Sequence, residues 1–248
     1  MLLKKRSTSQ ARLGVVAAAA LAAATGVAAG QTTYVETFDD GINHSGWTWD
    51  RTPRGGVVPS DGNPGGYFQS ELMALPSLFT SAPVFTGDFR ARGVTSIGGD
   101  LRTVQFSSPP SMISIALMHD NGTPENPFDD TYATFVSSIP APVAPDMGWV
   151  SFDIDVPSAS TETPEGWVLS GVLPQLPPTV GWDHLIQNVN EVIIAWSNPL
   201  EPVLLFDAVR GADNLRITYN VPGPGAAAGT ALLGVLGAAR RRRAQAGD

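Results

Sequence analysis

The chain has 248 residues, of which 43% are hydrophobic, and its 15 basic and 23 acidic residues give a formal net charge of −8. Four basic residues precede residue 31 and four follow residue 220, so the body between them carries 7 arginines and no lysine against 22 acidic residues, a charge of −15. Such a body repels nucleic acid and anionic membrane surfaces, and the lack of cysteine excludes disulfides, a thiol nucleophile, cysteine-ligated zinc and iron–sulfur clusters.

The first 30 residues predict a signal peptide for export by the Sec machinery. Lys4, Lys5 and Arg6 form a basic start, and an alanine-rich apolar stretch follows over residues 13–29. Small residues at its end suit cleavage before Gln31. The alternative, a membrane helix, is disfavoured by the alanine content and by those small residues. The remaining body, residues 31–220, is long enough for one domain with a sizeable core.

Short runs of β-type residues, separated by Gly, Pro, Asn and Asp, dominate this body. In chain order they predict strands at residues 33–38, 46–50, 67–72, 88–92, 94–97, 103–106, 111–118, 133–138, 149–156, 167–169, 191–196 and 214–219. The glycines at 98–99 predict a turn or bulge between two of them. An apolar stripe at i, i+3, i+4 and i+7 predicts a short helix within residues 181–190 that covers one end of the strands. Many short strands with such turns are typical of a sandwich or barrel.

Three stretches resemble exported bacterial domains of the jelly-roll sandwich type, the class of carbohydrate-binding modules and of laminin-G or concanavalin-like domains. They are Glu36-Thr-Phe-Asp-Asp-Gly41 followed by Trp47, Asp61-Gly-Asn-Pro-Gly-Gly-Tyr67, and Ala212-Asp-Asn-Leu-Arg-Ile217. The resemblance implies an all-β fold, an antiparallel jelly-roll-type β-sandwich whose first and last strands lie side by side. Outside the sandwich, the apolar stretches near the two ends of the chain predict an N-terminal signal helix and a short C-terminal apolar helix.

The same resemblance implies a structural calcium ion where the first and last strands meet. Members of this class hold the ion with carboxylates from both strands and from a nearby loop. The corresponding residues here are Glu36, Asp39, Asp61 and Asp213. Calcium prefers hard oxygen ligands of this kind. The alternative is that these are ordinary turn residues, because Asp-Gly sequences are typical of turns.

Three tryptophans are candidates for glycan binding. Trp47 and Trp49 are two residues apart, so on a strand their indoles point the same way and could form a platform on which sugar rings stack. Trp167 lies beside a proline-rich loop and could line the rim of a binding surface. The alternative for each tryptophan is packing in the core or at a sheet edge.

The sequence contains no recognisable catalytic set. Asp153 and Asp155 share one face of a strand that alternates strictly between apolar and polar residues, and this pattern predicts a solvated face rather than a catalytic pair. The three histidines are not spaced as metal ligands, and no Gly-x-Ser-x-Gly elbow is present. These patterns favour a protein that is not an enzyme.

The C-terminal segment, residues 221–243, has three parts and is followed by a short tail at 244–248. Pro222, Gly223 and Pro224 come first, an apolar stretch of residues 226–239 follows, and Arg240, Arg241, Arg242 and Arg243 close it. The order resembles the PEP-CTERM sorting signal of exopolysaccharide-producing Gram-negative bacteria, except that Gly223 stands where glutamate is usual. The resemblance implies handling by an exosortase, a membrane transpeptidase. The alternative is a plain tail anchor, although the apolar stretch is shorter than a spanning helix needs.

Together these patterns predict an exported, non-catalytic protein of the cell surface or extracellular matrix. It would contact the membrane only through its C-terminal segment and could bind exopolysaccharide weakly. Two alternatives remain open: an extracellular polysaccharide hydrolase or lyase, and a passive structural or adhesive protein without a ligand.

Overall fold

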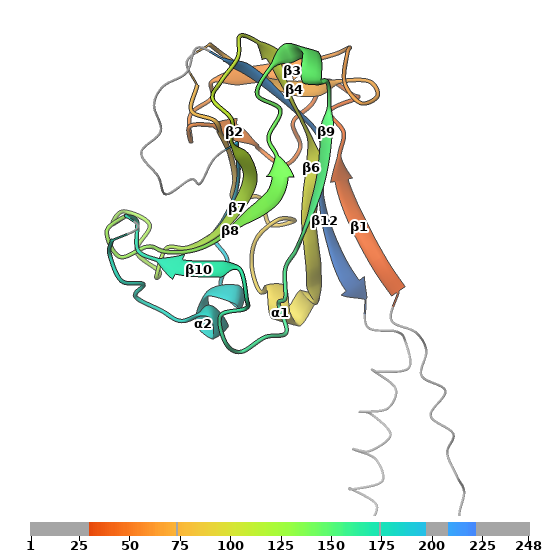
Figure 1. The fold of residues 1–248 in the computed structure, drawn as a ribbon. Coiled ribbons are helices and arrows are strands. Elements are labelled where there is room, and N and C mark those ends of the chain that lie inside the picture. Colours follow the sequence, from red (N-terminus) through yellow and green to blue (C-terminus); the bar gives the residue numbers. More distant parts are fainter. Residues whose placement is uncertain (1–29, 73, 174, 197–207, 222–248) are drawn as a thin grey trace, which may run out of the picture. The chain divides into compact units, whose positions relative to one another are not determined.

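The computed structural model describes residues 30–72, 74–173, 175–196 and 208–221. In these residues, the strands form two six-stranded sheets with antiparallel pairing throughout. The sheets pack face to face, with short helices at their ends (Figure 1). The expected all-β, jelly-roll-type sandwich is therefore confirmed.

The first sheet is built around the last strand, β12. Its strand order is β3-β4-β12-β6-β9, and β1 pairs with the remaining length of β12. The strands are β1 (Gly30–Glu36), β3 (Gly55–Val58), β4 (Tyr67–Ser70), β6 (Val94–Gln105), β9 (Val150–Asp155) and β12 (Val209–Val221). As expected, the first and last strands lie side by side, with Gly30 opposite Val221 and Glu36 opposite Leu215.

The second sheet has the order β10-β8-β7-β11-β5-β2. Its strands are β2 (Thr48–Trp49), β5 (Ser77–Thr80), β7 (Met112–His119), β8 (Thr131–Pro140), β10 (Trp167–Ser170) and β11 (Glu191–Ala195). The strand β10 is short and pairs with β8 only from Tyr132 to Phe135. The remaining residues of β8 therefore form an open edge on this side, as far as the described residues extend.

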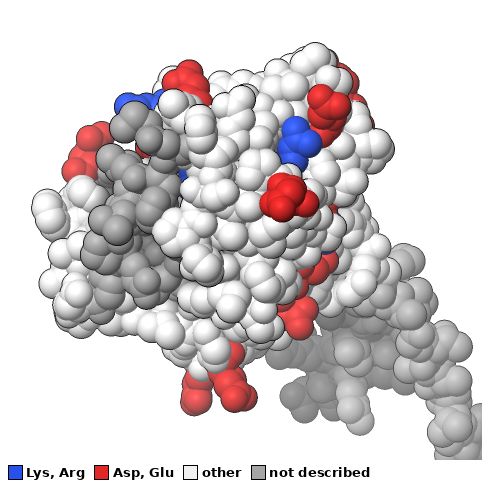
Figure 2. All heavy atoms as spheres, turned by 45° about the horizontal axis from the view of Figure 1, so that its top comes forward, with Lys and Arg blue, Asp and Glu red and all other residues white. Residues whose placement is uncertain are grey.

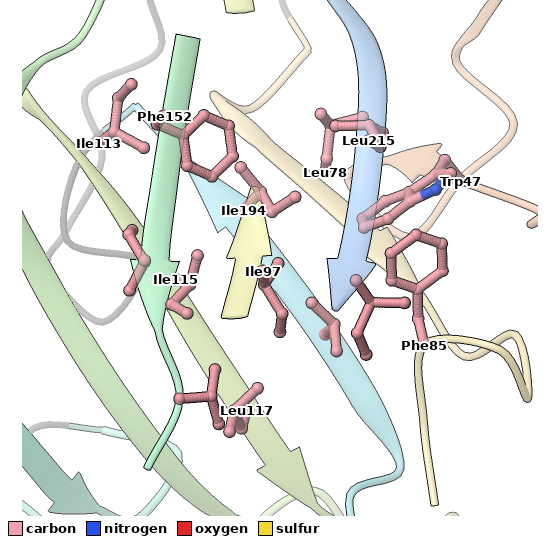
Figure 3. Close-up of a cluster of buried hydrophobic side chains, with 14 of the residues drawn as sticks. Trp47, Leu78, Phe85, Ile97, Ile113, Ile115, Leu117, Phe152, Ile194 and Leu215 are labelled. Atoms are coloured by element: carbon pink, nitrogen blue, oxygen red, sulfur yellow. The ribbon is translucent and has the colours of Figure 1, made fainter. Parts of the chain in front are cut away.

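The core fills the space between the sheets. Alternate residues of the central strands point inward, as the two-residue period of a strand requires. Figure 3 shows Ile113, Ile115 and Leu117 of β7 facing Ile97, Phe152 and Leu215 of the opposite sheet, with Trp47 and Phe85 packed beside them. All of these side chains are buried.

Helices lie at one end of the sandwich (Figure 1). These two helices are α1 (Phe89–Arg92) and α2 (Trp182–Ile186). Elsewhere, a 3-10 turn, η1 (Pro145–Met147), precedes β9. The apolar stripe predicted for α2 is buried, which confirms that the stripe faces the core. In contrast, the strand predicted at residues 88–92 is wrong. The Asp88 side chain accepts a hydrogen bond from the Ala91 N–H, and Gly93 ends the turn in the left-handed region.

Two further differences concern strands. The glycines at 98–99 make no turn, because β6 runs unbroken from Val94 to Gln105, but a bulge does occur here: the pairing with β12 shifts register between Asp213 and Arg216, opposite residues 98–100. A Cβ at Gly98 would lie 2.6 Å from the backbone carbonyl oxygen of Phe152, so close packing against β9 requires glycine at this position. The sequence pattern also missed β3 and β5, which are only four residues long.

Several sequence predictions lie outside the described residues. The signal peptide at residues 1–30, apart from Gly30, and the sorting motif and arginines at 222–243 belong to this group, as do the helices predicted at both ends and the tail at 244–248. Within the described part of the chain, no helix has both the length and the apolar character needed to cross a membrane.

We predict that Trp49→Ala lowers the free energy of unfolding by about 3–5 kcal/mol, because it empties a fully buried site. Urea unfolding measures this loss. The matched control is Val168→Ala on β10, where the side chain is 62% exposed and the change should stay within about 0.5 kcal/mol. A Trp49→Ala protein as stable as the control would contradict this account of the core.

Candidate functional site

A pocket of about 480 Å³ opens where the edges of the two sheets meet. One wall is β9, the edge of the first sheet, and the other is the open part of β8 together with β10. We call it the edge pocket. It is lined by Thr95, Phe135, Ser137, Ser138, Ile139, Asp153, Ile154, Asp155, Val156, Pro157, Glu165 and Trp167. Its volume falls within the range of small-ligand sites, roughly 300–1,000 Å³.

The aromatic wall of the edge pocket comes from two paired strands. Trp167 of β10 lies directly opposite Phe135 of β8, and their ring centroids are 5.6 Å apart. Trp182 of α2 supports the indole of Trp167 from behind at 5.1 Å. Gly166 has φ of 82°, and a Cβ there would lie 2.7 Å from Phe135 Cε2. Glycine at 166 therefore permits the close approach of the chain to the Phe135 ring.

The polar side of the edge pocket is acidic. Asp153 and Asp155 point outward from β9, which confirms the predicted solvated face, and Glu165 comes from the loop before β10. Asp153 pairs with Arg216, whose Nε lies 3.4 Å from Oδ2. Among the described residues, the side chains of Asp155 and Glu165 have no hydrogen-bond or ion-pair partner. Their oxygens are free to accept hydrogen bonds from a ligand.

The surface as a whole carries few cations. Figure 2 shows a face on which acidic side chains predominate over basic ones and most of the area is uncharged. This matches the charge of −15 calculated for residues 31–220. An acidic, mostly uncharged surface suits a neutral, hydroxyl-rich partner better than a polyanion.

The predicted tryptophan platform is wrong. Trp47 and Trp49 are 1% and 0% exposed, and each packs in the core, Trp47 against Phe85 and Trp49 against Trp196. Both indoles do point the same way, but toward the core. Of the three tryptophans proposed to bind glycan, Trp167 alone reaches a pocket wall, and it is 6% exposed.

The four predicted calcium ligands are not brought together. Glu36 is buried and accepts hydrogen bonds from the Ser45 N–H and hydroxyl at 2.8 and 2.6 Å, and from the Tyr34 hydroxyl at 3.2 Å. Asp61 is exposed, in the left-handed region of a turn. Only Asp39 and Asp213 lie near each other, and the sequence analysis missed their neighbour, Asp100.

The oxygens of these three aspartates face N–H donors. Asp213 accepts hydrogen bonds from the Asn63 and Asn214 backbone N–H groups at 2.6 and 2.7 Å. Asp100 accepts from the side-chain amides of the same two asparagines, at 3.1 and 2.7 Å. Asp39 accepts from the Gly66 N–H at 3.0 Å. Calcium needs six to eight oxygens turned toward one point. Within the described residues, no group of three or more His, Asp or Glu side chains could hold a metal ion, so the residues do not fit a calcium site.

Other residues of the edge pocket escaped the sequence analysis. Phe135 and Glu165 carry no local signal of a site, because they meet only through the pairing of β8 with β10. A Trp preceded by Glu-Gly at the start of a strand was visible at residues 165–167, but nothing local indicated what faces it.

Comparison with known proteins gives similarities to solved structures only, since no family model and no curated sequence matches the chain. One is CtCBM11, studied in solution with binding measurements (TM-score 0.45, 15% identity, covering 79% of this chain and 98% of that one). A second is the CBM22-1–CBM22-2 tandem domain of Xyn10C from Paenibacillus barcinonensis (0.45, 14%, 75% and 50%). A third is an exo-β-agarase (0.44, 15%, 76% and 26%), so the chain spans about a quarter of that enzyme. At TM-scores below 0.5 these likenesses carry no argument, and the fold assignment rests on the strand pairing.

We predict that Asp213 titrates in the mildly acidic range. Burial raises its pKa to about 6, with a smaller rise from the charges of Asp100 and Asp39. Because the unfolded value is about 3.9, the folded protein binds more protons between about pH 4 and pH 6. The contribution of Asp213 to the free energy of unfolding therefore falls as pH rises through this window and stays low above it.

Carbon-detected NMR of the Asp213 carboxyl gives the midpoint, and urea unfolding across the same pH range gives the stability. Asp100→Asn should lower the midpoint, since it removes a neighbouring charge, whereas Asp146→Asn on the exposed η1 turn should leave it unchanged. A wild-type midpoint near 4 would contradict the expected burial effect.

Proposed function

We propose that the sandwich binds uncharged sugar residues of a glycan in the edge pocket, and that the chain is an exported, non-catalytic surface or matrix protein. The observation that carries the proposal is the composition of the pocket. An aromatic wall, Phe135 and Trp167, faces carboxylates that have no partner, Asp155 and Glu165. A few placed polar groups on a largely apolar lining are typical of small-ligand sites.

The chemistry of a sugar matches both sides of the pocket. A pyranose has an apolar face that packs on an aromatic ring and hydroxyls that donate hydrogen bonds. Carboxylates are strong acceptors, and hydrogen bonds to a charged group contribute about 1.5–3 kcal/mol, more than neutral ones do. The edges of β8 and β9 leave the pocket open at the side, so a polymer can lie across it without a free chain end having to enter.

The hydrolase alternative has less support. Glycoside hydrolysis needs one carboxyl group kept protonated by apolar surroundings, opposite a second ionised one. Asp153, Asp155 and Glu165 are all exposed, and Asp153 is paired with Arg216. None of the three has the enclosure that a general acid requires.

Affinity electrophoresis in gels containing neutral soluble polysaccharides, with the exopolysaccharide of the native host among them, tests the proposal. Glu165→Gln should weaken retention by about tenfold, the loss expected when one charge-assisted hydrogen bond becomes neutral. Glu162→Gln, three residues away in the same exposed loop, has the same charge change and should match the wild type.

Lack of retention of the wild type on every polysaccharide, or equal retention of the two variants, would overturn the proposal. Near-ultraviolet circular dichroism of both variants checks that the fold is intact.

The proposal that the chain is exported rests on its two terminal segments and is tested separately. Mass spectrometry of the mature protein from its native host should find an N-terminus at Gln31 and a C-terminus shortened near Pro222–Pro224 by an exosortase-type enzyme. Recovery of both ends intact would contradict both the signal peptide and the sorting signal. It would not bear on the proposed glycan binding.

A further inference from the structure

A second polar cluster lies on the outer face of the first sheet, away from the core. Arg102 of β6 projects there between Tyr67 of β4 and Trp149, which precedes β9. The two rings stand at 80° to each other with centroids 5.6 Å apart, so they form a corner. The guanidinium carbon lies 4.5 Å from the Tyr67 centroid and 4.9 Å from the Trp149 centroid. We call these three residues the arginine corner.

Arg102 is unusual among the arginines of this body. Each of the other six reaches a carboxylate or backbone carbonyl oxygen; these residues are Arg51, Arg54, Arg90, Arg92, Arg210 and Arg216. In the described part of the chain, the Arg102 side chain makes no hydrogen bond or ion pair, and its buried Nε has no partner at all. The domain has 22 acidic residues that could have paired with Arg102, and a buried donor without an acceptor costs about 1–3 kcal/mol. The lack of a partner for Arg102 therefore indicates that a ligand supplies the acceptor.

The surroundings hold the guanidinium in place for a ligand. The Tyr67 hydroxyl donates to Gln69 Oε1, which leaves the amide nitrogen of Gln69 as a further free donor. Gly211 lies beneath the cluster, and a Cβ there would come within 2.9 Å of the Tyr67 ring and 3.3 Å of Arg102 Cγ. Stacking therefore fixes the plane of the guanidinium, while its N–H groups keep their capacity to donate. A planar fork of donors matches a carboxylate, which it can bind through two parallel hydrogen bonds.

We propose that the arginine corner binds the carboxylate of an acidic sugar, such as a single uronic acid residue in an otherwise neutral glycan. Trp149 is partly exposed and offers a ring for the sugar to pack against. Asp100, two residues away on the same face of β6, disfavours a doubly charged group such as a phosphate monoester but tolerates a single negative charge. The site is separate from the edge pocket. Trp149 lies just before β9, and the nearest pocket residue along this strand, Asp153, is four residues further on, about 13 Å away.

Isothermal titration with three matched ligands tests this inference: a glucuronic acid-containing oligosaccharide, the same oligosaccharide with its carboxyl groups reduced, and a sulfated neutral oligosaccharide. The wild type should prefer the first. Arg102→Lys keeps the positive charge but loses the planar pair of guanidinium donors, and should weaken binding of the glucuronic acid-containing oligosaccharide by about tenfold or more. Arg54→Gln is the control, because this exposed arginine directly precedes β3, at the far edge of the same sheet, and has only a 3.9 Å ion pair.

Equal affinity of the wild type for the acidic and the reduced oligosaccharide would overturn the inference, as would an unchanged affinity in Arg102→Lys. Equal binding of the sulfated ligand would overturn the assignment to a carboxylate. The result is separable from the proposed function, since Glu165→Gln should leave the preference for the carboxylate intact. Loss of neutral-sugar binding alone therefore counts against the edge pocket and not against the arginine corner.

Discussion

The sandwich depends on the pairing of one strand, β12, with three others. Its first half pairs with β4, its second half pairs with β1 along the same side, and β6 pairs with it on the other side. Chain segments 191 positions apart are thereby joined at the centre of the first sheet, as Gly30 opposite Val221 shows. A bulge between Asp213 and Arg216, with Asn214 in the left-handed region, sets which residues of β12 face outward.

This central strand also positions the chemistry. Gly211 leaves room for the arginine corner, Asp213 enters the carboxylate cluster, and Arg216 reaches Asp153 at the margin of the edge pocket. Because β12 occupies the middle of its sheet, β9 is left as an edge. The second sheet leaves the far half of β8 unpaired on the same side, within the described residues. The edge pocket thus follows from the strand order. The edge strand β9 and the unpaired part of β8 lie on the same side of the sandwich, and the pocket opens between them.

The sequence was most informative where a pattern depends only on local geometry. The alternation over residues 150–156 located β9 and its solvated aspartates, and the stripe at Trp182, Leu185, Ile186 and Val189 located α2. It failed where the answer depends on distant contacts. The spacing of Trp47 and Trp49 says that they share a face, but it does not say that this face is the core. The helix α1 has only four residues, too few to show a helical hydrophobic period, and it is set instead by its capping residues Asp88 and Gly93.

The candidate sites were the least predictable part, for the same reason. Asp39 and Asp213 do lie near each other, but their oxygens already accept hydrogen bonds. Asp213 accepts from the Asn63 and Asn214 N–H groups, and Asp39 accepts from the Gly66 N–H. No local sequence feature reveals this. Likewise, nothing in the sequence around Arg102 indicates a site, because Tyr67 and Trp149 come beside it only in the folded sheet. Contacts between residues that are remote in sequence define both the edge pocket and the arginine corner.

The central claim is that ligand recognition takes place at the edge pocket, and NMR chemical-shift mapping tests it most directly. Indole N–H signals of all six tryptophans are observed while a neutral oligosaccharide, chosen by retention in the electrophoresis gels, is added. The account predicts that the Trp167 signal and the amides of residues 153–156 shift in a saturable manner, while the indole signals of Trp47 and Trp49 do not. Saturable shifts confined to another face, with Trp167 and residues 153–156 unchanged, would contradict it.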